Sequence, residues 1–179
     1  MAAHAIVETT VPRDSALQAL LQEAHFADAY RGDLQRAELS PAEIFQRAFR
    51  ATPVWVSALL ALRNRMVRLV GLKDVGRFDA SPARHADDVG IGDRLGIFHV
   101  LGKTEREIVL GIDDRHLDVR VSVFKEGSVA GGRQVPAAPA AYVLSTVVRV
   151  HNRLGHLYML PVGRIHPLVV RALMRRARL

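Results

Sequence analysis

Apolar and polar side chains alternate within residues 115–124, RHLDVRVSVF. Because successive side chains of a β-strand point to opposite faces of a sheet, this pattern predicts a strand with one apolar face and one titratable face. We expect it to be a central strand of an antiparallel sheet, to which the other elements are added. The apolar face carries Leu117, Val119, Val121 and Val123, and the polar face carries His116, Asp118, Arg120 and Ser122.

The same alternation predicts further strands, and short polar turns between them indicate hairpins. Asp113 and Asp114 are predicted turn residues, and residues 126–140, rich in Gly, Pro and Ala, are a predicted flexible loop. After a turn at 152–155 we expect one more short strand, at 156–161. The strands predicted before it cover residues 26–34, 96–104, 107–113, 115–125 and 141–151.

Helix start and stop signals follow the first strand. Ser40 is a predicted N-cap, Pro41 occupies the first helical position, and Glu43 completes a capping box. Pro53 ends this helix and begins a second one, which ends before Gly71. The remaining predicted segments are a short helix at 14–24, a loop at 73–94 and an amphipathic helix at 163–178.

This order of elements predicts an α+β fold. A curved antiparallel sheet would grip the C-terminal helix, and the two helices after the first strand would close one end. The chain of 179 residues is long enough for one domain with its own core, so we assign a leader at 1–12 and one domain at 13–179. A sheet that curls around a helix leaves room for a cavity between them.

The composition of the chain excludes several kinds of site and of protein. Cysteine is absent, which excludes disulfides, thiolate zinc sites and cysteine catalysis. The N-terminal residues lack a secretory signal pattern and no segment is apolar enough to span a membrane, so we expect a cytoplasmic protein. The formal charge of +7 comes from an excess of arginine, part of which lies on two helical faces. These faces fit an ordinary solvated surface, and alternatively a contact with an anionic lipid or an acidic partner in preference to nucleic acid. These faces carry Arg63, Arg65 and Arg68, and Arg171, Arg175, Arg176 and Arg178.

The polar strand face supplies weak candidates for acid–base chemistry. His116 and Asp118 project from one face, and His151 and His99 lie on other predicted strands. A His-x-Asp pair has the geometry for a metal or a proton-transfer site, but it equally fits a structural polar network. Three converging ligands cannot be derived from this spacing, so we predict no metal and no cofactor. Ser145 and Thr146 have no base positioned beside them, and a hydrolytic triad is therefore not predicted.

Apolar side chains supply the stronger candidates for binding. Ligand pockets are lined mostly by apolar residues with a few polar groups that fix the ligand's orientation. The same residues are also core candidates, and the sequence does not separate the two roles. The predicted ligand-lining residues are Trp55, Leu59, Met66, His99, Val119, Val121, Thr146, Val148, Tyr158 and Leu173.

Three segments resemble a known family. The stretches PVWVSALLALRNRMVRLVGLK (53–73), VLGIDDRHLDVRVSV (109–123) and STVVRVHNRLGHLYMLPVGRIHPLVV (145–170) are similar to the bacterial domain of unknown function DUF2867, over residues 27–173. That family resembles the helix-grip superfamily of the birch pollen allergen and the START domains. The resemblance implies a carrier of a hydrophobic ligand or, as in some members of that superfamily, a cyclase or hydrolase. The domain also resembles an appendage of short-chain dehydrogenase-like proteins, but this chain has no Gly-rich dinucleotide loop, so it implies no nicotinamide chemistry.

Three hypotheses follow. The first is a protein, monomeric or homodimeric, that binds a hydrophobic small molecule or lipid between sheet and C-terminal helix. The second is an enzyme on the same scaffold, with His116, Asp118 and His151 converging on the cavity as acid–base groups. The third is an interaction module for a dehydrogenase-like partner, or a homodimer formed through the sheet.

Overall fold

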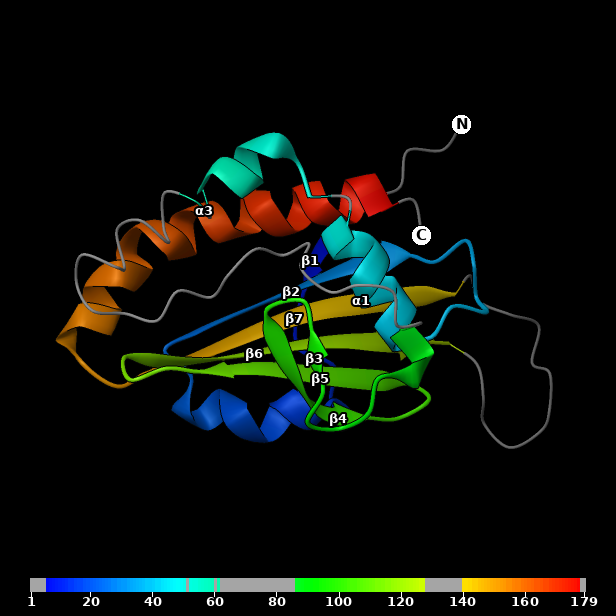
Figure 1. Cartoon of the computed structure of the whole chain (residues 1–179), viewed down its shortest axis with the longest axis horizontal. Helices are drawn as coiled ribbons and strands as arrows, with labels where there is room; N and C mark the ends of the chain where they lie inside the picture. The colour runs from blue at the N-terminus through cyan, green and yellow to red at the C-terminus, as the bar shows by residue number, and fades with distance from the viewer. Residues whose placement is uncertain (1–5, 51, 60, 62–85, 128–139, 178–179) are drawn as a thin grey trace.

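The computed structural model describes residues 6–50, 52–59, 61, 86–127 and 140–177 of the chain. Within these ranges, seven strands form one sheet in the order β1-β2-β7-β6-β5-β4-β3, with every neighbouring pair antiparallel (Figure 1). The predicted strand around residue 120 is the central one, β6. The strands are β1 (Val7–Thr9), β2 (Phe26–Asp33), β3 (Arg94–Leu95), β4 (Phe98–Lys103), β5 (Glu107–Asp113), β6 (Leu117–Glu126) and β7 (Ala141–Val150).

Two helices cover one face of this sheet. Helix α3 (Arg153–Ala177) runs along it and α1 (Pro41–Arg50) packs between α3 and strands β5 and β6 (Figure 1). The main core lies between these layers, where Ile44 and Phe45 of α1 and Met174 of α3 meet the apolar side chains of the strands. The predicted α+β architecture, a curved antiparallel sheet with a C-terminal helix in a helix-grip-like arrangement, is confirmed. We call the face under α3 the inner face.

The opposite, outer face carries a smaller core. The 3-10 helix η1 (Ala16–Glu23) places the fully buried Leu17 against Ala29, Val143 and Val147. The helix is attached at its start by Glu107 of β5, whose carboxylate accepts hydrogen bonds from the Ser15 and Ser122 hydroxyls and from the Ala16 amide. Strand β7 is therefore buried on both faces, and its sequence reads as a nearly continuous apolar run.

The start of α1 follows the predicted capping box. The Ser40 hydroxyl accepts a hydrogen bond from the Glu43 amide at 3.2 Å, and the Glu43 carboxylate accepts one from the Ser40 amide at 2.9 Å. Phe45 and Phe49 then stack on each other, with ring centroids 4.1 Å apart, and both meet Phe98 edge-on. A local sequence signal thus fixes where the helix begins, and its aromatic stripe fixes which face turns inward.

The prediction of a strand at 156–161 is wrong. Helix α3 begins at Arg153 and continues without interruption through that segment to Ala177. Pro161 and Pro167 lie inside it and remove two backbone donors, yet the helix persists because its buried side packs on the sheet. The first half of this helix was predicted as a turn and a strand because it contains the weak helix formers Gly155, Pro161 and Gly163.

Two boundaries also differ, and part of a third predicted element lies outside the described residues. Val7–Thr9, within the predicted leader, pairs with β2 as an edge strand. The predicted loop at 73–94 ends in Arg94, which belongs to β3. Of the second predicted helix, residues 54–59 are helical, whereas Met66 and most of the rest lie outside the described residues, as do Arg63, Arg65 and Arg68 and residues 128–139 of the predicted hairpin loop.

Candidate cavity between sheet and helix

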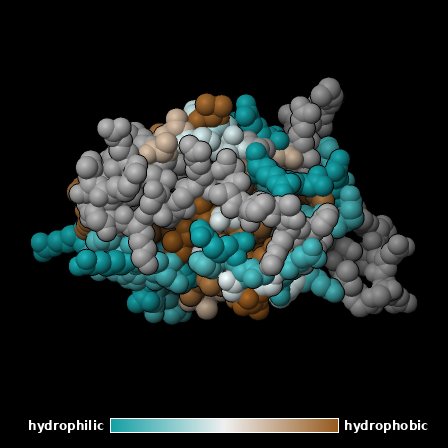
Figure 2. All heavy atoms as spheres, viewed as in Figure 1, coloured by the Kyte–Doolittle hydropathy of each residue, from teal (hydrophilic) through white to brown (hydrophobic). Residues whose placement is uncertain are grey.

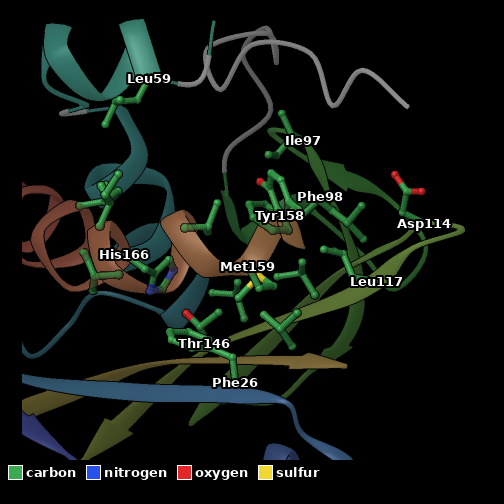
Figure 3. A pocket seen from close by; sticks show the side chains of 18 of the residues that line it. Phe26, Leu59, Ile97, Phe98, Asp114, Leu117, Thr146, Tyr158, Met159 and His166 are labelled. Atoms are coloured by element: carbon green, nitrogen blue, oxygen red, sulfur yellow. The ribbon is translucent and has the colours of Figure 1, made fainter. Parts of the chain in front are cut away.

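A cavity of about 290 Å³ lies between the inner face of the sheet and α3 (Figure 3). Strands β6 and β7 supply its floor through Leu117, Val119, Val121, Leu144 and Val148. In the space-filling view, apolar side chains are visible in the middle of the displayed face, below α3 (Figure 2). Helix α3 supplies the roof through Tyr158, Met159, Val162, Ile165, His166, Val169, Val170 and Leu173.

The predicted ligand-lining residues divide into three groups. Two do not line the cavity: Trp55 is 45% exposed, and His99 is exposed on β4. Trp55 turns away because Val56, its neighbour along the helix, is the buried side chain at 2% exposure. Met66 lies outside the described residues. The others line the cavity, namely Leu59, Val119, Val121, Thr146, Val148, Tyr158 and Leu173.

One polar pair at the cavity was not predicted. His166 of α3 lines the cavity, and its Nδ1 lies 2.7 Å from the Asp28 carboxylate of β2 (Figure 3). The Asp28 side chain is only 8% exposed, and the Phe26 ring meets the imidazole edge-on at 5.4 Å. The two residues are 138 positions apart, so no local pattern connects them. A single His in a helix and a single Asp in a strand carry no signal of this contact.

Thr146 lies beside this pair. In the β2–β7 register, Asp28 is directly opposite Thr146, and cross-strand partners of an antiparallel pair project from the same face. Thr146 is 3% exposed and lines the cavity. The floor below His166 is therefore polar at one point, whereas its surroundings on β6 and β7 are apolar.

His116 forms a structural contact at the start of α3. Its Nδ1 lies 3.0 Å from Asn152 Oδ1, which also accepts a hydrogen bond from the Gly155 amide. Asn152 is therefore the N-cap of α3, and the His116 Nδ1 must carry the hydrogen that it donates. The Asn152 side chain thus bonds local backbone at the predicted turn 152–155, which begins a helix and not a strand.

The three acid–base candidates do not converge. His151 Nε2 lies 3.0 Å from the Asp118 carboxylate, and strand alternation places both side chains on the outer face, away from the cavity. Arg120, on the same face, pairs with Asp113. His116 is at the cavity edge, with its Nδ1 engaged by Asn152. No group of three or more His, Cys, Asp or Glu side chains in the described part of the chain is arranged to hold a metal ion.

Burial raises the pKa values of two tyrosines on the inner face of the sheet. Tyr30 of β2 is 1% exposed, and burial together with the Asp28 and Glu8 carboxylates raises its pKa to about 12, although Arg171 opposes the shift. Burial and the nearby Asp33 also raise the pKa of Tyr142 well above its ordinary value. Both hydroxyls therefore stay neutral at physiological pH.

One arginine of the predicted basic face of the last helix makes contacts within the protein. Arg171 donates a hydrogen bond to the Glu8 carboxylate at 3.1 Å, and its guanidinium lies over the Tyr30 ring at 5.3 Å. This contact ties α3 to the edge strand β1. Arg175 and Arg176 are exposed in the last turn, and Arg178 lies outside the described residues.

Comparison with known proteins gives one match. A family model described as "Protein of unknown function (DUF2867)" matches residues 20–173, which is most of the chain. No curated protein and no solved structure matches. Among the described helices, none is long and apolar enough to cross a membrane.

Proposed function

This chain belongs to the DUF2867 family of proteins of unknown function, and with that as the starting point we propose that it binds a hydrophobic small molecule or a lipid between the sheet and α3. The observation that carries the proposal is the apolar cavity. Its volume of about 290 Å³ is close to the lower end of small-molecule sites, which span about 300–1,000 Å³.

The lining favours an apolar ligand over a charged one. None of the described lining residues is Lys or Arg, and most are aliphatic or aromatic. A ligand that buries roughly 200 Å² of apolar surface gains about 5 kcal/mol before the cost of association. That gain suits a compact hydrophobic molecule or one lipid chain.

Native mass spectrometry of the purified protein and uptake of an environment-sensitive apolar dye test the proposal directly. We expect either a co-purified small molecule that organic solvent extracts, or saturable dye binding with one site per chain. A protein that carries no such molecule and takes up no apolar probe would contradict the proposal.

A cavity-filling variant locates the site. Val119→Phe adds bulk at a half-buried position that faces the cavity, so we expect it to abolish dye binding while the circular dichroism spectrum stays that of the wild type. Val7→Phe is the matched control, because Val7 is 55% exposed on the edge strand β1. Dye binding by Val119→Phe at wild-type affinity would exclude this cavity as the site.

A further inference from the structure

Given the proposed function, we infer that His166, oriented by Asp28, and Thr146 form a polar subsite that binds the hydroxyl group of an otherwise apolar ligand, an alcohol or a phenol. Asp28 is a positioning residue in this subsite. The inference names the ligand's chemical class, which the apolar lining alone does not.

The Asp28 contact fixes the tautomer of His166. A carboxylate only accepts hydrogen bonds, so the Nδ1 that lies 2.7 Å from Asp28 must carry a hydrogen. In the neutral imidazole, Nε2 is then an acceptor. Among the described residues no hydrogen bond reaches Nε2, although the His166 side chain is only 23% exposed and lines the cavity. An acceptor in an apolar cavity favours a ligand that brings a donor.

Thr146 supplies the complementary group. Its hydroxyl can donate and accept, and it projects from the inner face directly opposite Asp28 in the strand register. Figure 3 shows Thr146 and His166 at the same end of the cavity. A ligand hydroxyl at this point would donate to His166 Nε2 and accept from the Thr146 hydroxyl, so both of its hydrogen-bonding functions are used.

The charges near the subsite disfavour an anionic ligand. Asp28 is negative and only 8% exposed, and no Lys or Arg is among the described residues that line the cavity. A carboxylate or phosphate would meet this negative charge without a compensating cation. A neutral hydroxyl avoids that cost. Asp114, the one carboxylate among the described lining residues, points away from the centre of the cavity (Figure 3).

The test compares a probe that carries a hydroxyl donor with one in which a methyl group replaces the hydroxyl hydrogen. 2-Naphthol and 2-methoxynaphthalene share an aromatic body, and methylation removes the hydroxyl hydrogen. By fluorescence titration at neutral pH we expect the wild-type protein to bind the naphthol about fivefold to tenfold more tightly, the size of one net hydrogen bond. Binding of both probes with equal affinity would overturn the subsite and leave the proposed apolar binding intact. Binding of neither probe would overturn both.

Variants assign the preference to its residues. His166→Leu and Thr146→Val should retain affinity for the methoxy compound and lose most of the preference for the naphthol. Asp28→Asn should reduce the preference. In ¹⁵N-labelled protein, NMR should show His166 as the Nδ1–H tautomer in the wild type and a loss of that tautomer in Asp28→Asn. A preference that persists in His166→Leu would overturn the inference.

The outer face supplies a matched control. Asp118 and His151 form the same kind of Asp–His pair at 3.0 Å on the face away from the cavity. Asp118→Asn and His151→Leu remove comparable groups and should leave the preference for naphthol unchanged. If they lower it as much as the cavity variants do, the effect is a general loss of structure and the subsite is not supported.

Discussion

At the scale of single residues, the burial of tyrosine lowers the stability of the folded protein at alkaline pH. The pKa of Tyr30 in the folded protein is raised to about 12, whereas the pKa of a tyrosine in the unfolded chain is about 10. The folded state therefore binds more protons above pH 10, so the free energy of unfolding falls as the pH rises from about 10 to about 12. Below pH 10 this contribution is fully present.

Tyr30→Phe tests this effect. The variant removes the ionisable hydroxyl, so we expect its free energy of unfolding to fall less than that of the wild type between pH 8 and pH 11, by roughly 1 kcal/mol. Urea unfolding at the two pH values gives the difference. Tyr142→Phe should show the same direction, because burial also raises the pKa of Tyr142. Identical pH profiles for wild type and Tyr30→Phe would contradict the assignment.

The residue scale also shows what a local signal can and cannot specify. Ser40 and Glu43 are three positions apart, and their reciprocal hydrogen bonds were predicted from that spacing alone. Asp28 and His166 make an equally definite contact across 138 positions, and the sequence contains nothing that pairs them.

We expect Ser40→Ala to lower the free energy of unfolding by about 1 kcal/mol in urea titration, with Ser57→Ala as a surface control. Equal stability of the two variants would contradict the capping role.

At the scale of elements, two glycines in α3 have opposite roles. A methyl group at Gly155 would overlap the His116 carbonyl oxygen and Val150, because the first turn of α3 lies directly against the start of β6 and the end of β7. At Gly163 a methyl group would only reach ordinary contact with the Phe26 ring, at 3.5 Å. The first glycine permits a close approach between elements, and the second only lowers helix propensity.

Two substitutions distinguish these roles by thermal and urea unfolding. Gly155→Ala should lower the free energy of unfolding by about 1–3 kcal/mol, since the helix start must move off the sheet. Gly163→Ala should raise it by about 0.5–1 kcal/mol, because Ala is the better helix former. If both variants shift stability in the same direction, the close approach at Gly155 does not constrain the fold.

At the scale of the whole molecule, the cavity links binding to stability. A ligand that binds only the folded state stabilises it by about 2.7 kcal/mol at a concentration of 100 times its Kd. For a chain of this length that corresponds to a rise in Tm of roughly 5–10 °C. We expect 2-naphthol to produce such a rise in wild-type protein and none in Val119→Phe, as measured by differential scanning fluorimetry. An equal rise in both proteins would place the binding site elsewhere.

The sequence by itself determined the elements whose signals are local. Strict alternation specified β6, apolar segments between turn signals specified β7 and β5, the latter at its observed bounds, and the capping box specified α1, because side-chain pattern and helix caps act over a few residues. The tertiary structure alone decided that 156–161 is helical, since packing of α3 on the sheet outweighs the poor helix propensity of its glycines and prolines. It also decided that Asp118 and His151 meet on the outer face while Asp28 and His166 meet at the cavity, because only folding brings distant strand and helix residues within hydrogen-bond distance.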